Sequence, residues 1–247
     1  MKKTFIDLGF LVLNNVFSDD EVNTILEIIA SADKANSTCR KSDDLFAIRK
    51  FFKEIPQAVS HAFNENLINI IVNTFGDEYF VTKSIYFDKP KKSNWFVAYH
   101  QDLTISVDKK IEMADFGPWT TKHNQFAVQP PLYILENNFT IRIHLDDTTR
   151  ENGALRVIPG SHRKGVYRPE SIDWKIEKEH ICEVNKGGIM IMHPLLLHSS
   201  SRTTNNNPRR VIHVEFSKQQ LPDGLSWAEF LLIKAASNIG LPPALLQ

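Results

Sequence analysis

Short runs of β-branched and aromatic residues, each followed by turn-forming residues, dominate the chain from residue 78 to residue 217. Beyond the run at 139–146, they lie at 78–88, 95–100, 154–159, 188–193 and 210–217. Runs of this kind are typical of strands, and their close spacing favours a β-sandwich or barrel. In the run at 139–146, Ile141, Ile143 and Leu145 alternate with polar residues. This strand is therefore expected to have one apolar and one polar face.

The segment that precedes these strands has the pattern of helices. Ser18 and Glu21 have the spacing of a capping box, in which each side chain accepts a hydrogen bond from the other residue's backbone. Apolar residues then recur at helical spacing up to Ile29. Further helices are expected over 44–53 and 55–75.

A second capping pattern, Ser226 followed by Glu229, predicts a C-terminal helix over about 226–239. The chain has no internal repeat, linker or low-complexity tract, and 247 residues suit one β-barrel domain. We therefore expect a single domain over 1–247, mainly β with flanking α-helices. Its parts would be N-terminal helices over about 18–75, a β core over about 78–217 and the C-terminal helix.

Residues 108–138 differ from the rest of the core, because they combine aromatic residues and prolines with little periodicity. Long irregular connections are often lids or binding loops. A structural loop packed on the barrel would have the same composition. Both interpretations stay open from the sequence.

Composition excludes several classes of protein. Acidic and basic residues balance at 29 each, so no net charge favours nucleic acid or an acidic membrane. Cys39 and Cys182 are too few for a disulfide framework, and no apolar stretch approaches the ~20 residues of a membrane span. Asp7 interrupts the first apolar run, which is unlike a signal peptide. We expect a cytoplasmic protein whose partner is a small molecule.

His100 and Asp102 form an H-x-D pair in a strand-like region. Residues two apart on a strand point to the same face, so the imidazole and the carboxylate would converge. A third, distant histidine would complete the 2-His-1-carboxylate set of non-haem Fe(II) oxygenases. His198, where an apolar run meets a polar turn, is the favoured candidate, and His193 is more simply a packed neighbour.

A competing pair, His213 and Glu215, has similar spacing. No histidine follows His213, so we interpret this pair as polar residues that face the barrel or the surface. His144 lies on the polar face of its strand and is a candidate to line the cavity rather than to bind the metal.

Arg209 follows His198 by eleven residues and is a candidate anion clamp. A dicarboxylate needs a fixed cation at its far end, and the planar fork of arginine binds a carboxylate through two hydrogen bonds. The adjacent Arg210 would point to the opposite face of the strand, so one of the two arginines can face inward.

Taken together, these residues resemble the phytanoyl-CoA dioxygenase family of Fe(II)- and 2-oxoglutarate-dependent oxygenases. The match covers nearly the whole chain. The segments that carry it are 9–13, 99–102, 144–147, 152–162, 187–198 and 208–210. No single segment is specific, but their combination is.

The resemblance implies a double-stranded β-helix, a distorted jelly roll of the cupin type. It places His100, Asp102 and His198 at the iron-ligand positions. Arg209 takes the position that binds the 5-carboxylate of 2-oxoglutarate, and Ser200 would assist it. The implied cofactors are Fe(II), 2-oxoglutarate and O2, with ascorbate as a supporting reductant. The presence of the aspartate disfavours the halogenating relatives.

The implied activity is hydroxylation of an unactivated C–H bond in a small-molecule metabolite, with release of succinate and CO2. Arg142, Trp95 and Trp119 are candidate substrate contacts. For Arg142 the alternative is a salt bridge to Asp146 or in the neighbourhood of Asp102, and for the tryptophans it is core packing. The acyl-CoA substrate is not carried over, because the chain departs from phytanoyl-CoA hydroxylase in the 108–138 region.

Two other functions remain open from the sequence. One is a zinc hydrolase that uses the same His2Asp site, since zinc also takes His and carboxylate ligands. The other is a cupin-like protein that binds a metal and a ligand without catalysis.

Overall fold

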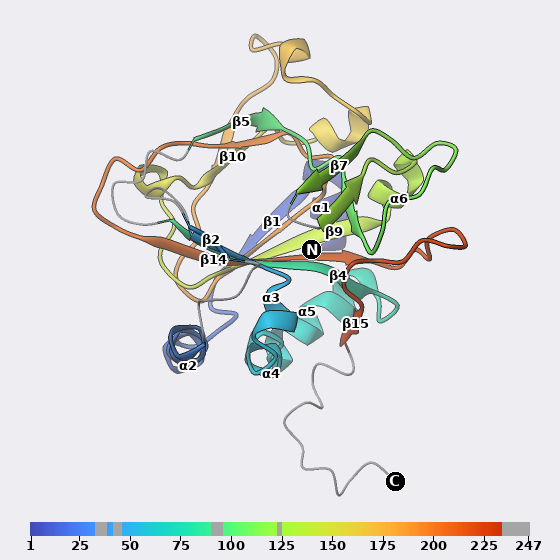
Figure 1. The fold of residues 1–247 in the computed structure, drawn as a ribbon. Helices are drawn as coiled ribbons and strands as arrows, with labels where there is room; N and C mark the ends of the chain where they lie inside the picture. The colour runs from blue at the N-terminus through green and yellow to red at the C-terminus, as the bar shows by residue number, and fades with distance from the viewer. Residues whose placement is uncertain (33–38, 42–45, 90–95, 123–124, 234–247) are drawn as a thin grey trace, which may run out of the picture.

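The computed structural model describes residues 1–32, 39–41, 46–89, 96–122 and 125–233. Two antiparallel sheets face each other, the smaller one above the larger in Figure 1. The larger sheet has the order β1 (Phe10–Leu13), β12 (Ile189–Met192), β9 (Asn138–His144), β14 (Arg209–Ser217), β4 (Phe80–Lys89), β3 (Phe46–Arg49) and β2 (Cys39–Lys41), with β15 (Leu231–Leu232) beside β4. The smaller sheet has the order β11 (His180–Cys182), β10 (Leu155–Val157), β13 (His198–Ser200) and β5 (Val97–His100).

A third sheet and several helices complete the described part of the chain. The third sheet has the order β6 (Ile105–Val107), β8 (Gln125–Val128) and β7 (Trp119–Lys122). The α-helices are α1 (Lys2–Leu8), α2 (Asp19–Ser31), α3 (Phe51–Glu54), α4 (Ala58–Ala62), α5 (Glu65–Phe75) and α6 (Leu132–Glu136). Three short 3-10 helices are η1 (Arg150–Asn152), η2 (Ser161–Lys164) and η3 (Pro169–Ser171).

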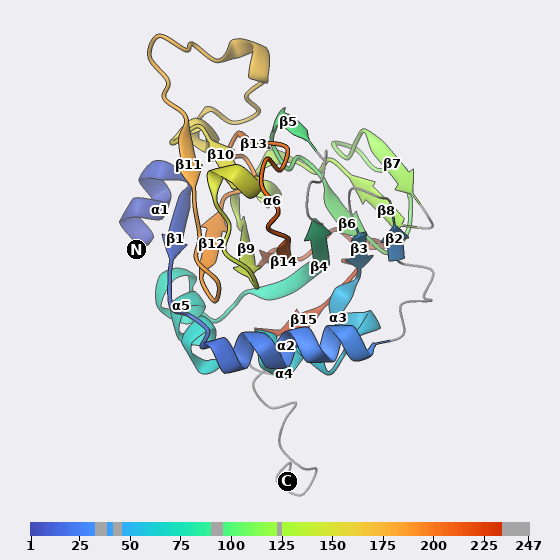
Figure 2. The ribbon, with the colours of Figure 1, turned by 90° about the vertical axis from the view of Figure 1, so that its left-hand side faces the viewer.

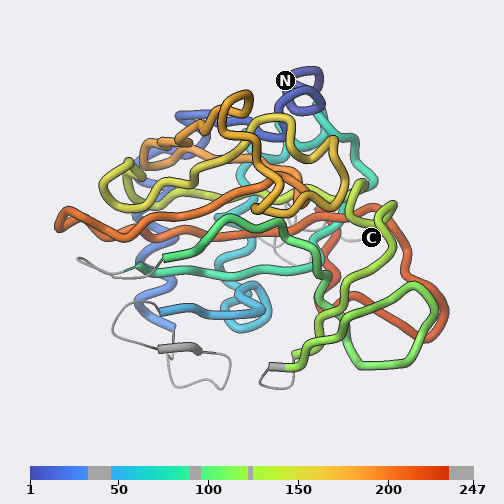
Figure 3. The backbone as a smooth tube through the Cα atoms, turned by 90° about the horizontal axis from the view of Figure 1, so that it is seen from above, coloured from blue at the N-terminus to red at the C-terminus, as the bar shows by residue number. Residues whose placement is uncertain are grey.

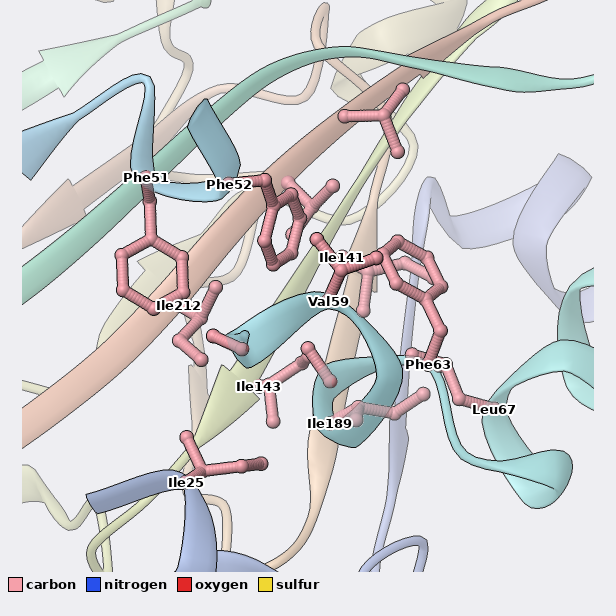
Figure 4. Packing of buried hydrophobic residues seen from close by; sticks show 14 of the residues in the cluster. Ile25, Phe51, Phe52, Val59, Phe63, Leu67, Ile141, Ile143, Ile189 and Ile212 are labelled. Carbon is pink, nitrogen blue, oxygen red and sulfur yellow. The ribbon is translucent and has the colours of Figure 1, made fainter. Parts of the chain in front are cut away.

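Helices α2, α4 and α5 cover the outer face of the larger sheet (Figures 1 and 2). Figure 4 shows the contact from close by, where isoleucines of the strands meet aliphatic and aromatic side chains of the helices. Ile141, Ile143 and Leu145 all lie fully buried in this cluster, so the apolar face predicted from their alternation is confirmed. The helices therefore remove one face of the sheet from solvent and leave the opposite face for the space between the sheets.

The inner face of the larger sheet carries several charged and polar side chains. Arg142 on β9 and Arg209, Val211 and His213 on β14 border a cavity between the two sheets. Along β9 the alternation thus places Ile141 and Ile143 toward the helices and Arg142 toward the interior of the barrel, whereas β14 lines the cavity with both charged and apolar side chains.

The N-terminal region departs in part from the helices expected over 18–75. The capping box is confirmed, since Ser18 Oγ accepts from the N–H of Glu21 at 3.2 Å and the carboxylate of Glu21 accepts from the N–H of Ser18 at 2.7 Å. The helix expected over 44–53 is wrong within the described residues, where β3 pairs with β4 and leaves one short helix, α3. Residues 44 and 45 of that expectation lie outside the described residues. The helix expected over 55–75 is two helices, and the second begins where Asn64 caps the N–H of Leu67.

The C-terminal helix expected over 226–239 is wrong within the described residues, where β15 pairs with β4 instead. Glu229 explains the difference, because its buried carboxylate accepts hydrogen bonds from the N–H and the hydroxyl of Ser84 at 2.7 and 2.6 Å. A carboxylate that accepts from Ser84 on β4 is not available to accept from the N–H of Ser226, as the capping box would require. Residues 234–239 of that expectation lie outside the described residues.

We expect Glu229→Ala to lower the free energy of unfolding by about 2 kcal/mol, because it leaves buried donors of Ser84 without their acceptor. Urea denaturation would measure the change. Glu78→Ala is the matched control, since the side chain of Glu78 is 70% exposed. Equal stability of both variants would show that the Glu229 contact does not hold the C-terminal segment.

The 108–138 region is more regular than expected, since it contains β7, β8 and α6. Its third sheet lies beside the segment that follows β14, as Figure 3 shows. The N–H of Asp108 donates to the carbonyl of Ser226 at 2.9 Å, and Val107 pairs with Trp227. Phe116, Val128 and Trp227 share one apolar cluster, so this region has a small core of its own.

In the described part of the chain, we find no helix with the length and apolar character that crossing a membrane requires.

Candidate active site

The structure brings His100, Asp102 and His198 together at one edge of the cavity. One potential ligand atom from each side chain lies within 4.8 Å of the others. Nε2 of His100 is 3.8 Å from Oδ1 of Asp102, and Nε2 of His198 is 3.8 Å from Oδ2. The two histidines are direct partners in the pairing of β5 with β13, which explains how residues so distant in sequence meet.

Each imidazole is held with Nε2 toward the centre of this group. Nδ1 of His100 lies 2.9 Å from the carbonyl of Ala98, and Nδ1 of His198 lies 2.9 Å from the carbonyl of Leu196. A carbonyl accepts only, so Nδ1 carries the proton and the lone pair is on Nε2. Metal-binding histidines are commonly oriented in this way. The N–H of Asp102 donates to the carbonyl of Pro194 at 2.8 Å, which fixes the carboxylate between the rings.

The protonation states also suit a metal ion. Burial outweighs the attraction of Asp102 and lowers the pKa of His198 to about 4, so this imidazole is neutral near pH 7. Burial alone would raise the pKa of Asp102. At the low pH where Asp102 titrates, the protonated His198, His213 and His100 together with Lys83 have the larger combined effect and lower that pKa to about 2. Neutral imidazoles and an ionised carboxylate are the forms that bind metals.

The cavity beside this group has a volume of about 180 Å³. Its lining in the described part of the chain mixes charged, polar and apolar side chains. They are Phe87, Val97, His100, Asp102, Arg142, Leu155, His198, Ser199, Ser200, Arg209, Val211 and His213. The candidate metal ligands therefore face a space that is partly apolar and carries two arginines.

Arg209 is buried on β14 and faces this cavity. Its Nε and Nη1 have no hydrogen-bond partner among the described residues. Burial and the positive charge of Arg142 lower its pKa to about 9, which still leaves the guanidinium charged near neutral pH. Buried donors without acceptors are rare and costly, so this arginine is arranged for an anion that comes from outside the protein.

Ser200, the expected assistant of Arg209, also lines the cavity. Its hydroxyl donates to the carbonyl of Gly153 at 3.0 Å. A hydroxyl can rotate, so it would have to leave that carbonyl to donate to a bound carboxylate. Arg210 points away as expected, and it binds Asp146 through Nε at 2.8 Å and Nη2 at 2.6 Å.

Arg142 therefore does not form the salt bridge to Asp146 that was its alternative, because Arg210 occupies that carboxylate. Instead, Nη1 of Arg142 lies 3.2 Å from Nδ1 of His213, its direct partner across β9 and β14. Burial lowers the pKa of Arg142 to about 10, and the negative charge of Asp102 opposes that effect.

The contact with His213 continues into a buried chain of polar groups. Arginine cannot accept, so Nδ1 of His213 accepts from Arg142 and its Nε2 carries the proton. That Nε2 donates to Oε1 of Glu215 at 3.1 Å, and Nζ of Lys83 donates to the same oxygen at 2.7 Å. His213 and Glu215 thus face the interior of the barrel. Lys83 was missed at the sequence level, although its place on an alternating strand is a signal of the inner face.

The other described candidates, His144, His193 and Trp119, are not among the described residues that line the cavity. His144 is buried and its Nδ1 contacts the hydroxyl of Thr148 at 2.7 Å, and it is not among the described residues that line the cavity. His193 packs 5.0 Å from the ring of His162, as a packed neighbour would. Trp119 packs on the apolar cluster of the third sheet, again away from the described lining. Trp95 lies outside the described residues.

Comparisons with known proteins identify the family and the fold. The sequence model of the family described as "Phytanoyl-CoA dioxygenase (PhyH)" matches residues 5–211. The "Dioxygenase himG" of Aspergillus japonicus is 27% identical over 124 residues, which are 49% of this chain and 37% of that protein. The "L-proline trans-4-hydroxylase" of Streptomyces griseoviridis is 27% identical over 132 residues, 42% of this chain and 46% of that protein. The chain thus spans less than half the length of these curated relatives.

Among solved structures, EctD from S. alaskensis with bound Fe has a TM-score of 0.67 at 20% identity. The likeness covers 87% of this chain and 75% of that one. At this identity it shows the fold alone. The mainly β jelly-roll architecture with flanking helices, expected from the sequence, is confirmed.

Proposed function

Because the chain belongs to the phytanoyl-CoA dioxygenase family, we propose that it is an Fe(II)- and 2-oxoglutarate-dependent dioxygenase. The reaction would hydroxylate an unactivated C–H bond of a small molecule. The observation that carries the proposal is the convergence of the His100, Asp102 and His198 ligand atoms on a cavity with a buried, unpartnered Arg209. The activities named for the two curated relatives, a dioxygenase and a hydroxylase, agree with it.

The donor set fits Fe(II). Two imidazoles and one carboxylate on one side of an ion leave the opposite side open, and this is the set used by non-haem Fe(II) oxygenases. When bound, Fe(II) with 2-oxoglutarate and O2 would supply the oxidising chemistry, in which one oxygen atom enters the substrate and the other enters succinate as CO2 leaves.

The roles of the chain's own residues follow from their positions. His100, Asp102 and His198 would hold the metal, with both imidazoles fixed by backbone carbonyls. Arg209 would bind the 5-carboxylate of 2-oxoglutarate through its unpartnered N–H groups, and Ser200 would assist after rotation of its hydroxyl. The apolar lining of the cavity would limit water around the reacting centre.

Arg209 argues against the alternatives. A zinc hydrolase with the same ligands has no need of a buried cation poised for a second anion. A cupin-like binding protein would keep the metal and the ligand but would not turn over. Dependence of product formation on both Fe(II) and 2-oxoglutarate separates the three functions.

We further propose that the substrate is a small-molecule metabolite and that the protein acts in the cytoplasm, without a nucleic-acid or membrane partner. The balance of 29 acidic and 29 basic residues supports the absence of a nucleic-acid partner. The free, buried thiol of Cys182 is consistent with a reducing compartment.

The test is succinate formation by the purified protein with Fe(II), ascorbate and 2-oxoglutarate in air, first alone and then with a metabolite panel. We expect slow turnover that requires Fe(II), disappears in His198→Ala, and rises with a panel member. His180→Ala is the matched control, since His180 is an exposed histidine on the neighbouring part of the smaller sheet. Succinate formation that persists without Fe(II), or that survives His198→Ala, would refute the proposal.

A further inference from the structure

Arg142 is a second buried cation in the cavity, distinct from the clamp assigned to Arg209. It lies on β9, faces the cavity and is 9% exposed. Its Nε has no hydrogen-bond partner among the described residues, and none of the ion pairs found there includes it. A buried guanidinium without a carboxylate is expensive unless a ligand supplies the anion.

The protein holds this guanidinium in place without neutralising it. His213 accepts from Nη1 through a lone pair, which orients the group but adds no negative charge. The carboxylate of Glu215, one step further, is already balanced by Lys83 at 2.7 Å. Burial lowers the pKa of His213, so this imidazole is neutral near pH 7. Among the described residues no carboxylate forms an ion pair with Arg142, and Asp102, whose negative charge acts on it, lies between the two candidate metal-ligand histidines.

The charges of the side chains that line the cavity also add up to an excess of positive charge. Asp102 is the single carboxylate among the described lining residues, and Arg142 and Arg209 are the two cations that accompany it. In the proposed reaction, Fe(II) and dianionic 2-oxoglutarate cancel each other. The side chains then leave one net positive charge, which a substrate with one negative group would neutralise.

We propose that the substrate of this enzyme carries a carboxylate and that Arg142, oriented by His213, is the residue that binds it. The proposal rests on the proposed oxygenase function and deepens it by naming the substrate class. Arg142 and the metal ligands line the same cavity, so a substrate anchored at Arg142 would extend toward the candidate metal centre.

The experiment measures binding rather than turnover. The full chain is loaded with Ni(II) and 2-oxoglutarate without oxygen, and calorimetry then measures its affinity for small aliphatic and cyclic carboxylates, each beside its primary amide. We expect carboxylates to bind and their amides to bind about tenfold more weakly or not at all, because a charge-assisted pair is lost. In Arg142→Met the preference for carboxylates should disappear, while the affinity for 2-oxoglutarate stays within about twofold.

Two further variants keep the test decisive. Arg142→Lys keeps the positive charge but loses the planar guanidinium, so it should retain part of the preference for carboxylates. It also provides a second test if Arg142→Met does not fold. Arg210→Met removes a neighbouring arginine that is paired with Asp146 outside the described cavity lining, and it should change nothing.

Contrary outcomes are distinct for the two proposals. If Ni(II) and 2-oxoglutarate do not bind to the wild-type protein, the oxygenase proposal fails. If both bind and carboxylates show no advantage over amides, or keep that advantage in Arg142→Met, the assignment of Arg142 is overturned while the oxygenase stands. Loss of 2-oxoglutarate affinity in Arg142→Met would overturn it as well, because Arg142 would then belong to the cosubstrate site.

Discussion

In Asp102→Ala, we expect the affinity for Fe(II) or for Ni(II) to fall by more than about 100-fold and substrate-dependent succinate formation to disappear. Residues that only orient metal ligands already contribute about 10–100-fold to affinity, so loss of a ligand itself costs more. The carboxylate is also the one negative charge between His100 and His198, and its pKa of about 2 keeps it ionised at any working pH.

Thermal unfolding with and without Ni(II) would check this result. A ligand that binds the folded state raises Tm by mass action, so the wild-type protein should show a metal-dependent shift and the variant should not. Without metal, both should show similar far-ultraviolet circular dichroism. Asp7→Ala, at an exposed position on α1, is the control and should keep the full shift. A normal metal-dependent shift in Asp102→Ala would show that the ion is held elsewhere.

In Arg209→Met, we expect the affinity for 2-oxoglutarate to fall by about 10-fold to 100-fold while metal binding is unchanged. The estimate follows from the loss of charge-assisted hydrogen bonds, which contribute about 1.5–3 kcal/mol each. The reason lies in the unpartnered Nε and Nη1, which have no acceptor within the described residues and would gain one from the bound carboxylate.

Calorimetric titration of the Ni(II)-loaded variant with 2-oxoglutarate would measure the loss. Arg210→Met is again the matched control, because it removes the same group from the next residue along β14. A saturating concentration of 2-oxoglutarate should restore part of the turnover of Arg209→Met, since the metal ligands are intact. An unchanged affinity in this variant would move the clamp to another residue.

The sequence was most informative where local patterns decide the structure. Alternation along 139–146 identified the two faces of β9, and the capping box identified the start of α2. Both depend on neighbours within a few residues. The helix expected over 44–53 was wrong because pairing with β4, a contact between distant segments, overrides local helix propensity there.

In the candidate site, too, contacts between segments distant in sequence could not be predicted from local patterns. The H-x-D spacing indicated His100 and Asp102, but their meeting with His198 depends on the register of β5 and β13, which no local pattern contains. The position of His198 between an apolar run and a polar turn made it a candidate, and the family resemblance then assigned it as the partner. Likewise, the sequence placed Arg142 on the polar face of its strand but suggested Asp146 or the neighbourhood of Asp102 for its salt bridge. The pairing of β9 with β14 places His213 opposite it instead.

Among the described strands, β5 lies at the edge of the smaller sheet and pairs with β13 alone. It carries His100, and Asp102 follows directly, whereas His198 belongs to the inner strand. In the proposed holoenzyme the bound ion would therefore cross-link this edge strand to the inner strand β13. Release of the ion and local unfolding of β5 would then be coupled. The affinity for iron would therefore depend on the free energy that is needed to detach β5 from the smaller sheet.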